Sequence, residues 1–407
     1  MRTNHLPRRL LRLGALAALL ALAACGGVSA TAPPWASTPT SVITPPPVGG
    51  TAASAATATR PGGATPATPA DATATRGPAA TPGVPALYPA IPLAAARLAR
   101  FSPAGDYLAA ARSNANPTLY LYRLGAGGQP QPLGEIPLAA PVDDLRFAPD
   151  GTALAAGDAG GVTLWAVPSG RVIARLVPTD RRRFYSLRQL AFSADGALLA
   201  ADDPGHGLVV WSVADGREVA AIARTGNPVN SLAFAPGGRS LLAVEPGVST
   251  FHLPAVAGVE EWEIATGRRL AFHPLPTPEE GELGPDGATV SWRADGGRGT
   301  QAATRDLPDG PTRLLAPYRA TPQEDVALLE RPALAFAGRY LLWGTSRGEV
   351  LIWDRATGAL VRHLGIGAGG GPTAVSLFRP VYRPDDGLVL ALTGDGWLAT
   401  WPITLAP

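Results

Sequence analysis

Residues 142–176, VDDLRFAPDGTALAAGDAGGVTLWAVPSGRVIARL, decide the fold. Four short apolar runs occur in this stretch: Val142–Phe147, Thr152–Gly157, Gly161–Ala166 and Arg171–Leu176. Turn signals rich in Pro, Asp, Ser and Gly separate the runs, and no helical period extends over a useful length. The stretch therefore predicts four antiparallel strands joined by tight turns.

The same pattern recurs along the chain roughly every 46 residues. Its opening motif, an aromatic or apolar residue before a Pro/Gly turn, has seven copies, which begin at Phe101, Phe147, Phe192, Phe234, Leu283, Phe336 and Tyr382. An aromatic residue ends the third apolar run of six copies, at Tyr122, Trp165, Trp211, Trp262, Trp353 and Trp401. In the fifth copy this position falls near Ala303–Arg305 and has no aromatic residue. We expect these aromatic residues to pack in the core, and Asp150 and Asp195 to form turns.

Four strands per repeat, with a closing Trp, resemble the blades of a WD40-type β-propeller. Trp353-Asp354 is the one literal Trp-Asp pair, and the Gly-His signature of the family is missing. The chain thus resembles a divergent bacterial WD40-like propeller of the YVTN or quinoprotein type. This resemblance implies an all-β fold over residues 86–407, with seven four-stranded antiparallel blades.

The two ends of this region predict how the ring closes. After Trp401 only residues 402–407 remain, which is too few for a regular fourth strand. The apolar stretch Ala86–Leu93 precedes the first repeat. We expect it to supply the outer strand of the last blade, because such pairing removes the open edges of the array.

The N-terminus has the features of a secretory signal: a basic start with Arg2, Arg8, Arg9 and Arg12, an apolar run from Leu10 to Leu22, and then Ala23-Ala24-Cys25. The sequence Leu22–Cys25 resembles the lipobox of bacterial lipoproteins, in which the cysteine is lipidated and becomes the first residue of the mature chain. We therefore predict a signal peptide at residues 1–24 and a lipid on Cys25. The apolar run is shorter than the 18 or so residues that a membrane-spanning helix requires.

Residues 25–85 consist almost wholly of Ala, Thr, Pro, Gly and Ser. Such a segment cannot bury enough apolar surface to offset the entropy lost on ordering, so we predict a disordered tether. Subtracting the four arginines of the signal peptide from the formal charge of +2 leaves −2. This net charge argues against nucleic acid as a partner. We also expect the protein to be a monomer.

Long connections predict a binding surface. In a four-stranded blade, the loops between second and third strands lie on the same face as the connections between blades. Binding sites are concentrated in such variable loops. The candidate residues are Arg181, Arg182, Arg183, Tyr185, His206, Phe251 and His252.

Catalytic and metal sites are less well supported. Asp202, Asp203 and His206 would supply metal ligands, but we place them in a loop between strands, with too few ligands for a site. We expect mostly small or apolar side chains facing the central channel, and no cofactor. The predicted function is non-enzymatic binding of a protein, peptide or glycan by a lipid-anchored extracytoplasmic protein. The alternatives are a propeller enzyme of the lactonase or quinone-dependent dehydrogenase type, and a purely structural envelope component.

Overall fold

The computed structural model describes fourteen segments: residues 85–89, 96–112, 116–179, 187–203, 207–224, 228–246, 256–276, 281–294, 301–317, 329–335, 338–345, 348–366, 377–394 and 396–406. Cys25 and the predicted signal peptide and tether therefore lie outside the described residues, apart from Pro85. The described part contains no helix with the length and apolar character that a membrane crossing needs. Its one helix is the short η1 (Ala126–Gly128).

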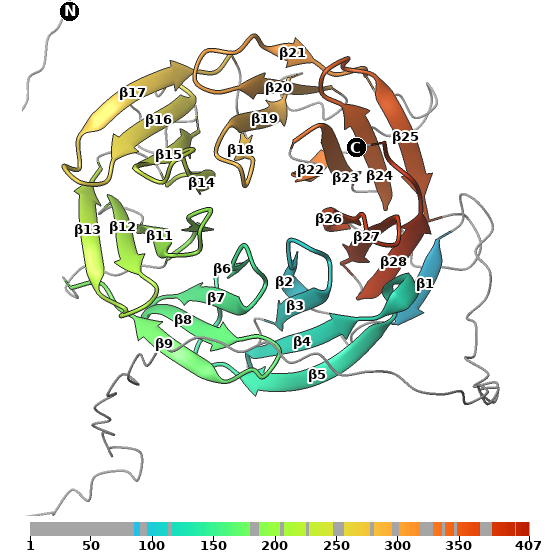
Figure 1. Ribbon diagram of the computed structural model, residues 1–407, viewed down its shortest axis with the longest axis horizontal. Coiled ribbons are helices and arrows are strands. Elements are labelled where there is room, and N and C mark those ends of the chain that lie inside the picture. The colour runs from blue at the N-terminus through green and yellow to red at the C-terminus, as the bar shows by residue number, and fades with distance from the viewer. Residues whose placement is uncertain are drawn as a thin grey trace, which may run out of the picture. The chain divides into compact units, whose positions relative to one another are not determined.

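Seven four-stranded antiparallel sheets form a ring (Figure 1). In chain order, the first two blades are β2 (Ala96–Phe101), β3 (Tyr107–Arg112), β4 (Thr118–Leu124), β5 (Pro130–Pro137), and β6 (Asp144–Phe147), β7 (Ala153–Asp158), β8 (Gly161–Ala166), β9 (Val172–Leu176). The third and fourth blades are β10 (Leu190–Phe192), β11 (Leu198–Asp203), β12 (Gly207–Ser212), β13 (Glu218–Ala223), and β14 (Ser231–Phe234), β15 (Ser240–Glu245), β16 (Gly258–Glu263), β17 (Arg269–Pro274).

The fifth blade has the shortest strands: β18 (Glu282–Leu283), β19 (Thr289–Arg293), β20 (Ala302–Asp306) and β21 (Arg313–Leu314). The sixth blade consists of β22 (Leu329–Ala335), β23 (Tyr340–Thr345), β24 (Glu349–Asp354) and β25 (Leu360–Gly365). The seventh consists of β26 (Leu377–Arg383), β27 (Leu388–Thr393), β28 (Trp397–Pro402) and β1 (Ala86–Pro89). The predicted seven-bladed all-β fold is confirmed.

Ring closure follows the prediction. β1 pairs antiparallel with β28, so that Ala86 lies opposite Thr400 and Pro89 lies opposite Trp397. The strand order β1-β28-β27-β26 places β1 outermost in the seventh blade (Figure 1). The first strand of the domain therefore completes its last blade, and residues 86–89 supply the closing pair.

The hydrophobic core is divided into seven clusters, and each lies between two neighbouring blades. The second blade shows why the strands read as continuous apolar runs. Successive side chains of a strand point to opposite faces, and here both faces are buried. Ala155 faces the third blade, whereas its neighbours Leu154 and Ala156 face the first. The structure thus explains why alternation of apolar and polar residues is weak in the sequence.

The recurring aromatic residues pack in these clusters, as predicted. Trp211 and Trp353 are fully buried and Trp401 is 1 % exposed. In five blades the ladder between the third and fourth strands shifts register at the aromatic residue, at Tyr122, Trp165, Trp211, Trp262 and Trp353. Such bulges bend a strand and re-aim its side chains.

The fifth blade departs from the pattern. Arg305 lies opposite Val290, the place that Trp353 takes opposite Leu341 in the sixth blade. The Arg305 guanidinium stands 5.9 Å from the centre of the Trp292 ring, which itself is buried. A tryptophan on the second strand thus supplies, in this blade, aromatic bulk that the third strand lacks.

Candidate functional site

The predicted binding residues Arg181, Arg182, Arg183, Tyr185, His206, Phe251 and His252 all lie outside the described residues. The strand ends next to them are described. In the third blade, Leu190 lies opposite Ala201, Asp203 opposite Gly207, and Gly207 opposite Ala223. This register confirms that the loop between second and third strands and the connections between blades leave from one face. The binding role of that face stays a prediction.

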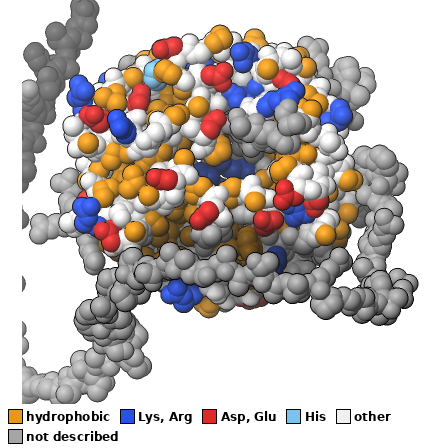
Figure 2. Space-filling model, in the orientation of Figure 1, with side chains coloured by type: hydrophobic (Ala, Val, Ile, Leu, Met, Phe, Trp, Pro, Cys, Tyr) orange, Lys and Arg blue, Asp and Glu red, His pale blue; other side chains and the backbone are white. Residues whose placement is uncertain are grey.

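A cavity of about 490 Å³ lies on the axis of the ring, and residues from all seven blades line it. The inner strands β2, β6, β10, β14, β18 and β26 contribute most of the wall, together with the turns that follow four of them. Figure 2 shows the opening at the ring axis, with basic side chains inside it. The volume is in the range of small-molecule and peptide-anchor sites.

Charged side chains from four blades reach this cavity. Arg100, Arg146 and Arg379 line it on β2, β6 and β26, and Glu282 lines it on β18. Most of the lining is small or apolar, as expected, but these four charged side chains were not predicted there. Isolated arginines in a repeat sequence do not reveal whether they face a neighbouring blade, the solvent or the axis, and the ring geometry decides this.

Asp144 holds two of the arginines in place. Its carboxylate lies 2.8 Å from the Arg100 guanidinium and 3.3 Å from Nε of Arg146, and it accepts a hydrogen bond of 3.1 Å from the Leu190 backbone N–H. Arg146 Nε also donates to the Leu190 carbonyl oxygen at 2.8 Å. Burial alone raises the pKa of Asp144, but Arg146, Arg100 and the Leu190 N–H together hold it below its usual value. Asp144 is therefore a charged, buried support for both arginines.

Arg379 and Glu282 form a second charged pair across the inner edge of the sixth blade. Their side chains are 17 % and 8 % exposed. On the same side, the backbone N–H of Leu283 donates to the Ser231 hydroxyl at 3.0 Å. Polar bonds between blades thus recur around the cavity, and they fix the positions of its charged groups.

Apart from Asp286 and three serines, the remaining wall is apolar. Phe101, Phe147 and Phe192 contribute to it, and so do Pro103, Pro149 and Pro285 from the turns that follow the inner strands. The repeated Phe-x-Pro motif therefore has a second role besides packing. In the first two blades it gives the cavity rigid, apolar groups next to Arg100 and Arg146.

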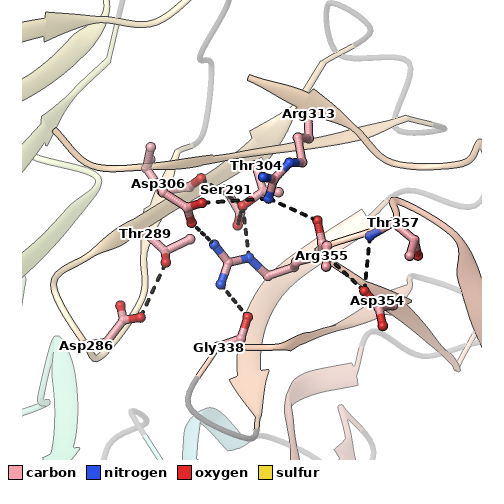
Figure 3. A network of polar contacts seen from close by, with 12 residues as sticks. Asp286, Thr289, Ser291, Thr304, Asp306, Arg313, Gly338, Asp354, Arg355 and Thr357 are labelled. Carbon is pink, nitrogen blue, oxygen red and sulfur yellow. Dashed lines mark hydrogen bonds and ion pairs between the residues drawn. The ribbon is translucent and has the colours of Figure 1, made fainter. Parts of the chain in front are cut away.

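A network of polar contacts borders the cavity between the fifth and sixth blades (Figure 3). Arg355 donates to the Gly338 carbonyl oxygen, to the Asp306 carboxylate, and over 3.4 Å to the Thr304 hydroxyl. Ser291, which lines the cavity, donates to Thr304 at 3.2 Å. The network ties two blades together beside the site and leaves Arg355 only 7 % exposed.

Asp202 and Asp203 are not in a loop, contrary to the prediction. They end β11 and are 1 % and 3 % exposed. The Val229 backbone N–H donates to Asp202 at 3.2 Å, which joins the third blade to the fourth. Burial raises the pKa of Asp202 to about 6, against the opposing effects of this hydrogen bond and of Arg224. The polar side chains of Asp202 and Asp203 suggested a loop. The hydrogen bond from the Val229 backbone N–H allows Asp202 to be buried in a strand instead.

Arg224 lies close to these carboxylates. Its Nε donates to Glu260 at 2.6 Å, and its guanidinium lies 3.3 Å from Glu245. Glu260 also accepts from Arg269 at 3.0 Å and from the Trp262 indole at 3.2 Å. Glu245 ends β15, the strand before the 247–255 connection, and Glu260 lies on β16, the strand after it.

The turn aspartates behave as predicted. Asp150 accepts from the backbone N–H of Thr152 at 3.0 Å, and Asp195 accepts from Ala197 at 3.0 Å and from the Ser193 hydroxyl at 2.6 Å. The hydrogen bond from Ser193 is the largest cause that lowers the pKa of Asp195. Among the described residues, no group of three or more His, Cys, Asp or Glu side chains is arranged to hold a metal ion.

No protein-family model matches the chain, and no curated protein matches its sequence. The fold itself, a closed ring of seven four-stranded blades, is that of a seven-bladed β-propeller.

Proposed function

We propose that the protein is a lipid-anchored extracytoplasmic binding protein without enzymatic activity. In this proposal Cys25 carries the lipid, the chain acts as a monomer, and the propeller holds a protein, peptide or glycan partner near a membrane. The axial cavity is the observation that carries the binding role. Its arginines are fixed by the buried Asp144 before any ligand arrives, and such preorganisation lowers the entropic cost of binding.

The place where the chain enters the ring supports the tether. β1 is the outermost strand of its blade, so the described part of the domain begins at the circumference and not at the axis. An attachment at the circumference is compatible with a cavity that is open to a partner. The argument for lipidation is the sequence around Cys25, which resembles a lipobox. Several acyl chains buried in a bilayer would give a durable membrane anchor.

Crosslinking on intact cells tests the proposal. Wild-type protein should label with a radioactive fatty acid, sediment with membranes and capture a partner. Cys25→Ser should lose the label and the membrane association while its propeller keeps its melting temperature. A Cys25→Ser protein that still sediments with membranes would refute the anchor, and wild-type protein that captures nothing would refute the binding role.

A second experiment distinguishes the loop face from the axial cavity as the surface that contacts the partner. Combined replacement of Arg182, Tyr185 and Phe251 by alanine should abolish capture and leave thermal stability unchanged, if the loop face is the main contact surface. Unchanged capture would exclude that face. It would leave the axial cavity as the contact surface to be tested.

A further inference from the structure

Arg146 is the residue of the cavity wall whose hydrogen-bond donors are available to a ligand. Its Nε is used by the Leu190 carbonyl oxygen and by Asp144. Within the described part of the chain, its two terminal amino groups, Nη1 and Nη2, have no hydrogen-bond partner, and the side chain is 17 % exposed. A guanidinium fixed through Nε presents both terminal amino groups to one ligand, the arrangement that binds a carboxylate in a bidentate manner.

The other charges limit what this group can bind. Arg100 and Arg146 share the single carboxylate of Asp144, which leaves one positive charge between them, and Glu282 is paired with Arg379. Asp286, in the turn after β18, also lines the cavity and accepts from Ala288 N–H at 3.1 Å. Carboxylates at Glu282 and Asp286 disfavour a ligand with several negative charges, because like charges repel in a poorly hydrated space. The balance favours a single negative charge at Arg146.

The shape of the wall defines the rest of the ligand. Phe101, Phe147 and Phe192 lie on the three successive inner strands that surround Arg146, and Leu232 and Leu283 continue the apolar surface. An apolar group placed there would bury area worth about 25 cal/mol per Å². A charged head at Arg146 and an apolar body on this wall are the two features that the ligand must combine.

We propose that the cavity binds a carboxylate carried by an apolar group, with the carboxylate on Arg146. Two sources have this chemistry: the free C-terminus of a polypeptide that ends in an apolar residue, and a small apolar carboxylic acid. The inference rests on the proposed binding function and defines its ligand class. Asp144 is a positioning residue in this site, since it orients Arg146 without reaching the cavity.

Calorimetric titration of the full chain with three probes tests the proposal. The probes are N-acetyl-Ala-Phe with a free C-terminus, the same dipeptide as its C-terminal amide, and 4-phenylbutanoate. The free-acid dipeptide should bind at least about tenfold more tightly than the amide, because the amide lacks the charge that meets Arg146. Stronger binding of the dipeptide than of 4-phenylbutanoate identifies a polypeptide end as the source, and the reverse identifies a small acid. Equal binding of acid and amide, or no binding of any probe, would overturn the proposal.

Two variants locate the binding in the cavity. Arg146→Gln should weaken the free-acid dipeptide at least about tenfold and abolish the preference over the amide. Ala194 lies exposed in the turn after β10 and lines the cavity, so Ala194→Trp should block access without touching Arg146. Arg175→Gln, at an outer-strand arginine that pairs with Asp158, is the matched control and should bind like wild type. Normal binding by both cavity variants would refute the site.

Failure here is distinguishable from failure of the proposed function. If wild-type protein captures a partner on cells, and Arg146→Gln captures the same amount, the cavity is not the site and the binding function stands. If neither captures a partner, the binding function itself fails.

Discussion

Arg383 of the last blade donates a hydrogen bond of 2.9 Å to the carbonyl oxygen of Gly125 in the first blade. The same guanidinium donates to the Leu124 carbonyl oxygen at 3.3 Å and to Asp386 at 2.8 Å, and the residue is 4 % exposed. The first and last blades are therefore joined by a buried charge as well as by the β1–β28 pair.

Arg383→Met should destabilise the domain by about 3 kcal/mol, because it removes the cation paired with Asp386 and the donor to the buried carbonyl groups of Leu124 and Gly105. Urea unfolding monitored by tryptophan fluorescence measures this change. Arg217→Met is the control, since its side chain is 70 % exposed and lies 3.8 Å from Asp215. A loss no larger than that of the control would show that Arg383 does not contribute to closure.

Deletion of residues 86–93 should destabilise the whole propeller. It removes β1, whose Leu87 and Tyr88 pack against the two clusters that flank the seventh blade. Burial of two such side chains is worth more than about 2 kcal/mol. Deletion of residues 61–68, equal in length, should leave the melting temperature unchanged. Normal melting of the first variant would contradict closure by β1.

Replacing glycine by alanine should destabilise the protein to different extents in two Pro-Asp-Gly turns. Gly151 and Gly287 both have a positive φ, at 72° and 62°. A Cβ at Gly287 would lie 1.8 Å from the Phe234 carbonyl oxygen, whereas one at Gly151 would have its nearest neighbour, Ser102 Cβ, at 3.9 Å. Gly287→Ala should therefore lose at least about 2 kcal/mol more stability than Gly151→Ala. Equal losses in thermal unfolding would show that the fourth and fifth blades separate easily.

Asp202 should make stability depend on pH between about 4 and 6. Burial raises the pKa of its carboxyl to about 6 in the folded state, above the ordinary value of 3.8. The folded protein therefore binds more protons than the unfolded chain in this range, so this contribution to stability is lost as pH rises through the folded pKa. The effect is on the order of 2–3 kcal/mol. Asp202→Asn should remove it, and the same pH slope in wild type and variant would refute this prediction.

Chelation should not destabilise the protein. The carboxylates of Asp144 and Glu282 are already paired with arginines, which oppose the approach of a cation. Overnight treatment with EDTA should leave the melting temperature unchanged, and metal analysis of untreated protein should find no stoichiometric Ca²⁺. A tightly bound, stoichiometric Ca²⁺ would instead favour the propeller-enzyme alternative.

The repeat made most of the fold predictable. The second blade's strands begin within two residues of the predicted runs, and even the place of the missing aromatic residue was correct, at Arg305 on β20. These features are local: a strand, a turn and an aromatic residue recur within one copy. The pairing of β1 with β28 was predictable because the last copy lacked a strand.

The axial site was not predictable in the same way. Arg100 and Asp144 belong to different copies, and the sequence does not state that one blade's inner strand leans toward the next. The residue that precedes the leading Phe or Leu is Arg in the first two copies, Ala in the next two and Glu in the fifth. Comparison of this single position among copies was the signal that would have found the charged wall. Asp202 was misplaced for a related reason, since its partner Val229 belongs to the next blade.

The outermost position of β1 has a mechanical consequence. Any pull on the chain before Pro85 reaches the domain first at the four residues that pair with β28. In the proposed arrangement, with a lipid on Cys25, the strand that closes the ring would also be the strand that bears the load. Force on the tether would therefore act on the seam of the propeller, and the buried Arg383 contact would reinforce that seam from the side of the first blade.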